Sequence, residues 1–201
     1  MRILAFTDIH GSLQALNRVK QKVKSQNPDL LVCAGDISLF ERGITALMKN
    51  LDKLGKKIMM IHGNHESAVT LNNLSKLFKN IIFIHKTYFT ENDLLFLGYG
   101  GGGFSIADRA FDRTAITRFK NIIKNNKSKK IILVTHAPPY KTRLDSLVGG
   151  HCGNKSIRHF VEKNKVNLLI CGHLHENFGK EDNIGRTKII NPGPYGIMIK
   201  I

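Results

Sequence analysis

Five short apolar runs, separated by segments with helical periodicity, are the feature that most restricts the fold of this chain. Each run is four or five residues long, which suits a buried strand and is far too short for a membrane span. Between the first two runs, apolar residues recur at three- and four-residue steps from Leu13 to Val23, which predicts a helix over residues 12–25. Strands that alternate with helices are typical of α/β proteins. We therefore predict strands at residues 3–6, 30–34, 58–61, 131–135 and 168–171.

The rest of the chain completes a mixed fold with two sheets. Three short runs at residues 81–84, 88–90 and 94–97 predict an antiparallel meander, because they follow one another closely. Near the end, residues 187–190 and 195–200 flank the turn Asn191-Pro192-Gly193-Pro194 and predict a hairpin. No linker or internal repeat divides the chain, so we expect a single domain over residues 1–201. Further helices are predicted at residues 42–54, 66–79, 113–126 and 154–164.

The charge balance narrows the classes of partner. The chain has 31 Lys and Arg against 15 Asp and Glu, a formal net charge of +16. Such an excess favours phosphorylated substrates or nucleic acid, although an ordinary solvated surface rich in lysine explains it equally well. The cysteines Cys33, Cys152 and Cys171 show no paired spacing, so neither a disulfide framework nor a zinc knuckle is predicted. We expect no signal peptide, no membrane partner and a cytoplasmic location.

Polar residues follow each of the five predicted strands directly. In open α/β sheets, ligands bind beyond the carboxyl ends of the strands, so these residues are candidates for one shared site. Chance placement of polar residues in loops would rarely put Asp, Asn or His after all five strands. In chain order the segments are Asp8-Ile9-His10, Gly35-Asp36, Gly63-Asn64-His65-Glu66, Thr135-His136 and Gly172-His173-Leu174-His175.

These donors have the chemistry of a transition-metal site. Two Asp, one Asn and four His supply the oxygen and nitrogen ligands that suit divalent Mn, Fe, Zn, Co or Ni. No thiolate belongs to the set, so a structural zinc site of the cysteine type is not expected. Seven protein donors are too many for one tetrahedral ion with an open position, and they suit two ions that share one carboxylate.

The five motifs in this order resemble those of the calcineurin-like metallophosphoesterase superfamily, in particular its small bacterial and archaeal members. The resemblance extends from Asp8 to His175, and the turn Asn191-Pro192-Gly193 is similar to one near the end of such members. It implies an α/β fold, a four-layer α/β/β/α sandwich with two mixed β-sheets. It also implies a binuclear metal centre that hydrolyses phosphate esters.

The resemblance also implies a role for each polar residue. One ion would be held by Asp8, His10 and His175, and the other by Asn64, His136 and His173, with Asp36 as the bridge between them. Two cations so close together repel, which is why an anionic bridge is needed. His65 would act as the catalytic residue that protonates the leaving oxygen or stabilises the transition state. Manganese is the expected metal, with Fe, Zn, Ni or Co as alternatives.

Several nearby residues have less certain roles in the sequence. Arg143, His151 and Arg158 lie in the segment after His136 and are candidates for substrate binding, since an arginine there can clamp a phosphate oxygen. Placement of these three on the surface is an equal alternative. Glu66 is expected to cap or charge the following helix. The segment Tyr99–Gly103 lacks the spacing of a phosphate-binding loop and is predicted to be a flexible connection.

Departures from related families limit the expected activity. Asp36 is followed by Ile37-Ser38-Leu39, and His62 precedes the Gly63 motif, unlike the Asp-Arg-Gly and Arg of protein Ser/Thr phosphatases. Leu39 stands where purple acid phosphatases have a tyrosine. We therefore predict a phosphoesterase that cleaves a phosphodiester, or a simple phosphomonoester, by in-line attack of a metal-bridging hydroxide. The alternatives are a metal-dependent nuclease and a non-catalytic binding scaffold. A small phosphorylated substrate is the expected partner, nucleic acid is the second, and the oligomeric state stays open.

Overall fold

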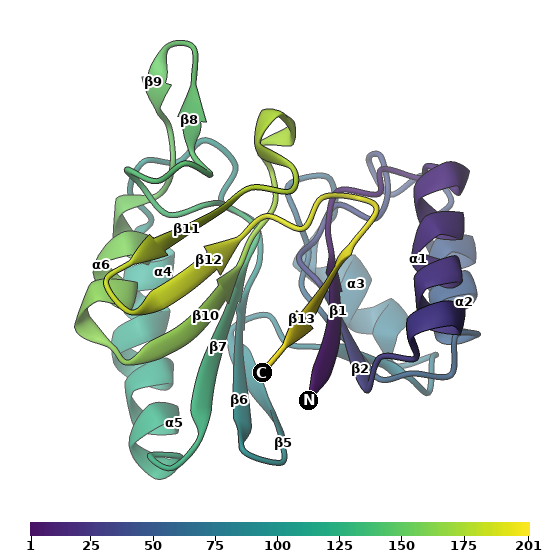
Figure 1. The fold of residues 1–201 in the computed structure, drawn as a ribbon, viewed down its shortest axis with the longest axis horizontal. Coiled ribbons are helices and arrows are strands. Elements are labelled where there is room, and N and C mark those ends of the chain that lie inside the picture. Colours follow the sequence, from purple (N-terminus) through teal and green to yellow (C-terminus); the bar gives the residue numbers. More distant parts are fainter.

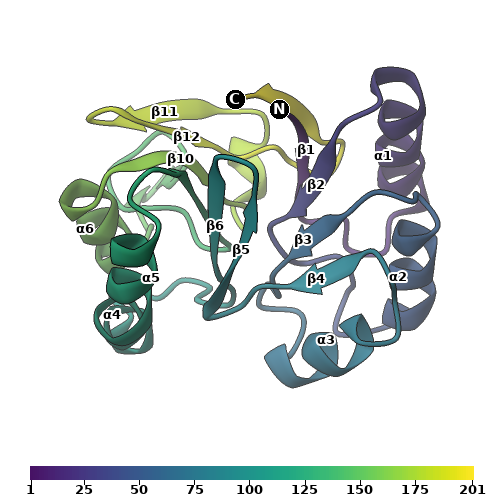
Figure 2. The ribbon, with the colours of Figure 1, turned by 90° about the horizontal axis from the view of Figure 1, so that it is seen from below.

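Two β-sheets lie face to face, and helices cover the outer face of each sheet (Figure 2). The computed structural model describes the whole chain, residues 1–201. The order of the layers is helices, sheet, sheet and helices, and each sheet contains both parallel and antiparallel strands. The predicted four-layer α/β/β/α sandwich is therefore confirmed.

The first sheet combines the first four strands of the chain with its last strand. In spatial order it contains β13 (Ile197–Lys200), β1 (Arg2–Phe6), β2 (Leu30–Cys33), β3 (Ile58–Met60) and β4 (Ile81–Phe83). Its outer face is covered by α1 (Leu13–Gln26), α2 (Ile44–Asp52) and α3 (Ala68–Ser75). The four strands β1 to β4 are parallel, and β13 runs antiparallel to β1. Helix α1 begins after Ser12, whose hydroxyl accepts a hydrogen bond from the Ala15 N–H, and it ends at Asn27 in the left-handed conformation.

The second sheet contains six strands from residues 87–190. In spatial order it contains β11 (Glu181–Ile184), β12 (Thr187–Ile190), β10 (Val166–Ile170), β7 (Lys130–Thr135), β6 (Leu94–Tyr99) and β5 (Thr87–Glu91). Its helices are α4 (Arg109–Thr114), a π-helical turn (Ala115–Phe119), α5 (Lys120–Asn125) and α6 (Lys155–Lys163). The first three of these form one continuous helical run, which begins four residues before the predicted start because Asp108 caps it.

The core between the sheets explains why the strands are apolar along their whole length. In β1, Ile3 and Ala5 belong to the cluster between the two sheets, whereas Leu4 and Phe6 pack against the helices of the first sheet. All four side chains are fully buried. Because both faces of each sheet are covered, a strand here reads as a continuous hydrophobic run rather than an alternating one.

The predicted antiparallel meander over residues 81–97 is wrong. Strand β4 pairs in parallel with β3 in the first sheet, and only β5 and β6 form an antiparallel hairpin, in the second sheet. The chain passes from one sheet to the other between these strands, around His85. Strand β4 follows α3 in a β-α-β connection, which places it beside β3 whatever its distance from the next strand.

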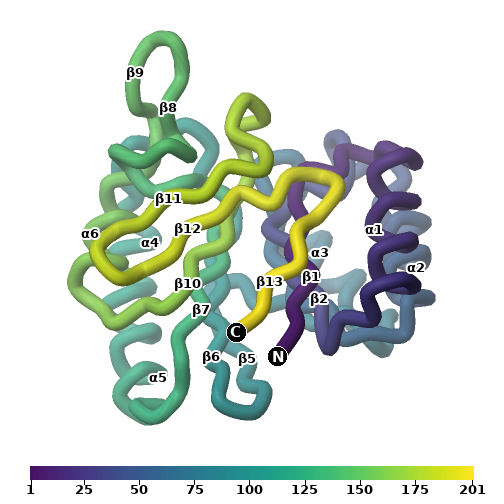
Figure 3. Tube along the Cα trace, in the orientation of Figure 1, coloured from purple at the N-terminus to yellow at the C-terminus, as the bar shows by residue number.

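The predicted terminal hairpin is also wrong, because its two strands belong to different sheets. Strand β12 pairs with β10 and β11, whereas β13 pairs with β1. The turn Asn191-Pro192-Gly193-Pro194 carries the chain across, and Figure 3 follows this path to the C-terminus, which lies beside the N-terminus. Gly193 is bound at the crossing, since its carbonyl accepts a hydrogen bond from the Thr7 N–H.

A small hairpin projects beyond the sandwich (Figure 1). It consists of β8 (Ser146–Leu147) and β9 (Gly150–His151), with Val148 fully exposed at its tip. No helix in the structure combines the length and the hydrophobicity that crossing a bilayer requires.

Candidate metal centre

The carboxyl ends of five strands from both sheets meet at one edge of the sandwich. Hydrogen bonds join the sheets there: for example, His173 N–H donates to Asp8 Oδ2 over 3.0 Å, and His136 Nδ1 lies 2.8 Å from the Ala34 carbonyl oxygen. The strands are β1, β2 and β3 of the first sheet and β7 and β10 of the second. The structure thereby brings together eight of the predicted site residues: Asp8, His10, Asp36, Asn64, His65, His136, His173 and His175.

The first group of donors consists of Asp8, His10 and His175. The Nε2 atoms of His10 and His175 lie 3.1 Å apart, and each lies 3.6 Å from Asp8 Oδ1. An ion held at about 2.0–2.2 Å from its ligands spaces neighbouring ligand atoms about 3.0–3.6 Å apart. The three atoms therefore have the spacing that a shared metal ion requires.

The second group consists of Asn64, His136 and His173. Asn64 Oδ1 lies 3.0 Å from His136 Nε2 and 2.9 Å from His173 Nδ1. Asp36 lies between the two groups, because its Oδ2 is 3.8 Å from His10 Nε2 and 3.2 Å from His136 Nε2. One carboxylate oxygen is thus near both candidate ion positions.

The hydrogen bonds of the second group leave room for a cation. The Ala34 carbonyl can only accept, so Nδ1 of His136 carries a hydrogen and Nε2 points toward the oxygens of Asp36 and Asn64. Burial would lower the pKa of His136, but the hydrogen bond with Asp36 and its negative charge outweigh burial and raise that pKa to about 9. The position therefore favours positive charge, which a proton or a metal ion can supply.

The first group has an unsatisfied ligand atom. Asp8 Oδ1 is buried and has no hydrogen-bond partner, while Oδ2 accepts from the Thr7 hydroxyl and from His173 N–H. Burial would raise the pKa of Asp8, yet the imidazoles of His10 and His175, whose Nε2 atoms lie 3.6 Å from Oδ1, outweigh it and lower that pKa. A buried, ionised oxygen without a partner is costly unless a cation binds it. The donors present therefore fit the two metal ions that the resemblance implies.

Four of the seven predicted ligands have a strained backbone. Their φ angles lie in the left-handed region, which costs a residue other than glycine roughly 1 kcal/mol or more. Neighbouring loops hold this conformation, since Asp8 N–H donates to the Gly35 carbonyl and His10 N–H to the Asp36 carbonyl, each over 3.0 Å. Such strain persists where surrounding structure imposes it, as is common at functional sites. The angles are 54° at Asp8, 47° at His10, 51° at Asp36 and 73° at His173.

Two glycines in the motifs are required by close approach of the ligands. A Cβ atom on Gly63 would overlap the Asp36 carboxylate, and one on Gly172 would overlap the Asp8 carboxylate and the Thr7 hydroxyl. Glycine at these positions lets the ends of neighbouring strands approach closely enough to join the two donor groups.

Glu66 has a different role from the predicted helix cap. Ser67 caps α3, because its hydroxyl accepts a hydrogen bond from the Thr70 N–H. The buried Glu66 carboxylate instead accepts from the backbone N–H groups of Asp36, Ser38 and Gly63 and from the Ser38 hydroxyl. It ties the loop after β2 to the loop after β3. The sequence contains no local signal for this tie, because Asp36 and Ser38 lie about thirty residues away from Glu66.

The three predicted substrate-binding residues have partners outside the metal cluster. His151 Nδ1 lies 2.8 Å from Asp145 Oδ1, and the backbone N–H of Arg143 donates to Asp182. The Arg158 guanidinium donates to the carbonyls of Tyr140 and Lys141 and pairs with Glu162 over 2.7 Å. These contacts hold the segment between β7 and α6 in place, and the role of the three residues in substrate binding stays a prediction.

The glycine-rich segment after β6 is closely packed in its first part. A Cβ on Gly100 would overlap His62, and the Gly100 N–H donates to His85 Nδ1 over 2.9 Å. Further along, a Cβ on Gly103 would contact nothing. The expected flexible connection therefore does not describe Gly100, which the packing of His62 and His85 requires to be a glycine.

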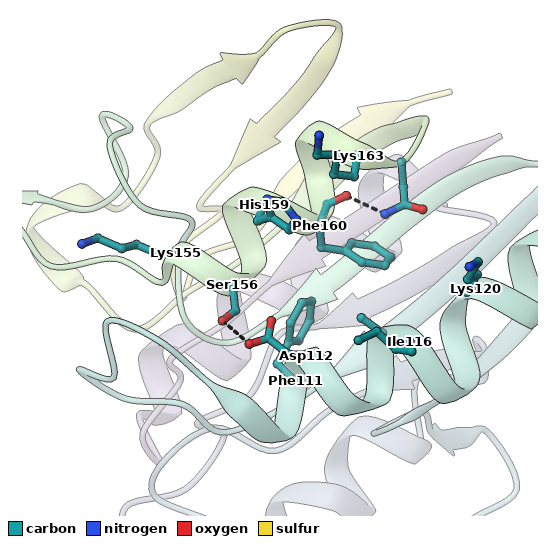
Figure 4. Close-up of a pocket in the computed structure, with 11 residues that line it drawn as sticks. Phe111, Asp112, Ile116, Lys120, Lys155, Ser156, His159, Phe160 and Lys163 are labelled. Carbon is teal, nitrogen blue, oxygen red and sulfur yellow. Dashed lines mark hydrogen bonds between the residues drawn. The ribbon is translucent and has the colours of Figure 1, made fainter.

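A large cavity, shown in Figure 4, is lined by residues outside the metal cluster. It has a volume of about 740 Å³ and lies between the helical run 109–125 and α6, with the buried rings of Phe111 and Phe160 in its wall. Lys120, Lys155 and Lys163 surround it, and none of the eight clustered residues lines it. The clustered donors therefore indicate a metal centre by their chemistry, and the size of a cavity adds nothing to this.

Most of the chain is similar in sequence to a known protein family. Residues 1–177 match the family model of the calcineurin-like phosphoesterases. An uncharacterized protein from Methanocaldococcus jannaschii is 32% identical over 204 residues, a match that covers 96% of this chain and 88% of the relative.

Solved structures share the fold at low sequence identity. A protein from Thermus thermophilus has a TM-score of 0.77 and 17% identity, and the match covers 96% of this chain and 89% of that one. A dimetal phosphatase from Danio rerio has a TM-score of 0.68 and 11% identity, with 94% and 86% covered. An archaeal phosphodiesterase has a TM-score of 0.56 and 17% identity, with 96% and 84% covered.

Proposed function

Because this chain belongs to the calcineurin-like phosphoesterase family, we propose that it hydrolyses phosphodiesters, or simple phosphomonoesters, with the help of two divalent metal ions. The observation that carries this proposal is the pair of donor groups that share Asp36. Two proteins of the same fold, described as a dimetal phosphatase and as a phosphodiesterase, agree with it.

Each donor group would hold one ion. Asp8, His10 and His175 form the first site, Asn64, His136 and His173 the second, and Asp36 contacts both. When bound, two such ions supply the positive charge that makes a water nucleophilic near neutral pH and polarises the phosphoryl group. The two aspartates carry the only formal negative charges among these seven ligands, so the site keeps a net attraction for phosphate once both ions are present.

The surroundings of His65 support the role that we propose for it. Its ring lies against Phe40 and His10, with ring centroids 4.4 and 4.8 Å apart, and its backbone N–H donates to Asp36 Oδ1. Its Nε2 lies 4.0 Å from Asp36 Oδ2, the longest of the contacts to that oxygen. We assign His65 the transfer of a proton to the leaving oxygen in an in-line displacement.

The ligand atoms present do not select a single metal. Imidazole and carboxylate ligands without a thiolate suit manganese as well as Fe, Zn, Co and Ni. We propose manganese, and reconstitution of the metal-free protein with each ion tests the choice. The expected result is hydrolysis of bis(p-nitrophenyl) phosphate, and more weakly of p-nitrophenyl phosphate, that disappears on chelation. Absence of turnover with all five metals would refute the proposed function.

A nuclease is the second candidate, favoured by the net charge of +16. Binding through phosphates weakens steeply as salt rises. Preferential cleavage of an oligonucleotide over small diesters, with salt-sensitive affinity, would replace the first proposal by this one. Elemental analysis of the reconstituted protein separates both from a scaffold, which would hold no metal. The cytoplasmic location stays a prediction.

A further inference from the structure

Two exposed phenylalanines lie against imidazoles of the metal cluster. Phe40 is 69% exposed, and its ring centroid lies 4.4 Å from that of His65. Phe104 is 66% exposed and lies 4.6 Å from His173. A single exposed hydrophobic side chain is ordinary on a protein surface. Two such rings at the candidate centre, each on a different imidazole, require a more specific explanation.

The backbone at Phe40 is strained in a way that keeps its side chain outside the core. Phe40 and Glu41 both have left-handed φ angles, 49° and 62°. Both sides of this turn are anchored, because Ser38 is bound by the Glu66 carboxylate and the Glu41 carboxylate accepts from Ser67 N–H over 2.7 Å. A strained conformation held from both sides marks a position where the direction of the side chain matters.

Phe40 lies close to the place where the leaving group is expected. If His65 protonates the leaving oxygen, the group attached to that oxygen lies beside His65 and therefore within reach of Phe40. A phenylalanine face that is open to solvent binds planar rings by stacking, with little sequence or substituent preference. Phe104 contacts His173 instead, which belongs to the second donor group.

We propose that Phe40 binds a planar aromatic ring on the leaving group, so that the substrate class is phosphodiesters whose leaving alcohol carries a nucleobase or an aryl ring. This inference rests on the proposed function and specifies the substrate of the same site. The competing explanation is that Phe40 only holds the His65 ring in place. That role would affect all substrates equally, whereas stacking affects only those with a planar leaving group.

The test compares two diesters that keep a methyl group and differ in the leaving alcohol. Methyl phenyl phosphate has a planar leaving group, and methyl hexafluoroisopropyl phosphate has a non-planar one of similar acidity. Using the reconstituted full chain, we expect Phe40→Leu to lower kcat/KM for the phenyl diester about tenfold relative to the other diester. Intrinsic reactivity cancels in this ratio. Phe40→Tyr keeps the ring and should restore the preference.

Phe104→Leu is the matched control, since it removes an equally exposed ring from the other imidazole. We expect it to change both rates alike and leave the ratio unaltered. An equal loss on both diesters in Phe40→Leu would overturn the proposal in favour of a role in positioning His65. A selective loss in Phe104→Leu instead would place the aromatic group on the other side and also overturn it.

A binding measurement separates failure of this inference from failure of the proposed function. Calorimetric titration of the metal-loaded protein with phenylphosphonate and methylphosphonate needs no turnover, because the carbon–phosphorus bond is not hydrolysed. Tighter binding of phenylphosphonate that is lost in Phe40→Leu supports the inference even if no diester is cleaved. The same preference in Phe40→Leu as in the unaltered chain would refute it, whatever the activity.

Discussion

At the scale of single residues, His136 is the imidazole of the cluster whose direction a backbone partner fixes. His136 is held by the Ala34 carbonyl, so its other nitrogen can only point toward Asp36 and Asn64. His65 has no comparable partner on its ring: its Nδ1 is buried without a hydrogen bond, and only its main-chain N–H binds Asp36. A ring bound at its second nitrogen suits a metal ligand. His10 Nδ1 and His173 Nε2 are buried without a hydrogen bond as well, so the unpartnered nitrogen does not by itself distinguish His65 from the ligands.

Replacement of His65 tests whether it transfers a proton or binds a metal ion. We expect His65→Asn to lower kcat on bis(p-nitrophenyl) phosphate by about 100-fold or more, because proton transfer to the leaving oxygen is lost. The metal content, measured by elemental analysis, should stay at that of the unaltered protein. His136→Asn is the matched comparison and should lose metal together with activity. If metal content falls in His65→Asn as steeply as the rate, His65 is a ligand and its assigned role is wrong.

At the scale of elements, the site depends on connections between loops that leave different strands. The Glu66 carboxylate joins the loop after β2 to the loop after β3. On the other side, His85 lies where the chain leaves β4 for the second sheet, and its Nδ1 accepts from the Gly100 N–H just after β6. These contacts set the spacing of the strand ends, and with it the spacing of the donor groups.

The contact at His85 predicts a pH dependence of stability. Burial, together with the charges of His62 and Lys86, lowers the pKa of His85 from 6.5 to about 3. Between these values the unfolded chain binds a proton that the folded chain does not, so stability is present above pH 6.5 and is lost as pH falls toward 3. His85→Asn keeps an acceptor for Gly100 and removes this titration. In metal-free urea denaturation, we expect its stability to fall less steeply with acid, by about 1.4 kcal/mol per pH unit.

The exposed His159 on α6 provides the control for that experiment. His159→Asn removes a histidine whose side chain is open to solvent, so it controls for the loss of an imidazole as such. Equal slopes for His85→Asn and the unaltered protein would show that His85 titrates normally and that its burial has no thermodynamic effect.

At the scale of the whole molecule, the net charge of +16 surrounds a site that would itself bind cations. A net positive charge attracts an anionic substrate over distances comparable to the Debye length, which falls from about 30 Å at 0.01 M salt to about 10 Å at 0.1 M. We expect kcat/KM for an anionic diester to fall several-fold over this range while kcat stays constant, because only capture is affected. A kcat/KM that does not respond to salt would mean that the basic surface does not assist this substrate.

Features that depend on residues close together in the sequence were predictable, whereas contacts between residues far apart in the sequence were not. The strands and most helices were predictable, because strands buried on both faces produce apolar runs, and because Ser12 and Asn27 mark the ends of α1 locally. The candidate ligands were recognisable because Asp, Asn and His follow each strand directly, and the matching family confirms the resemblance.

Only the tertiary structure decided which strands are neighbours and which side chains meet. Because they are close in the sequence, β4 and β5, and likewise β12 and β13, were predicted to pair. In each case the two strands belong to different sheets, because burial against a second sheet outweighs the local preference for a hairpin. The tie that Glu66 makes between two loops and the contact of Phe40 with His65 likewise join segments about 25 to 30 residues apart. Local patterns report how one segment is buried, whereas such contacts depend on how all segments pack together.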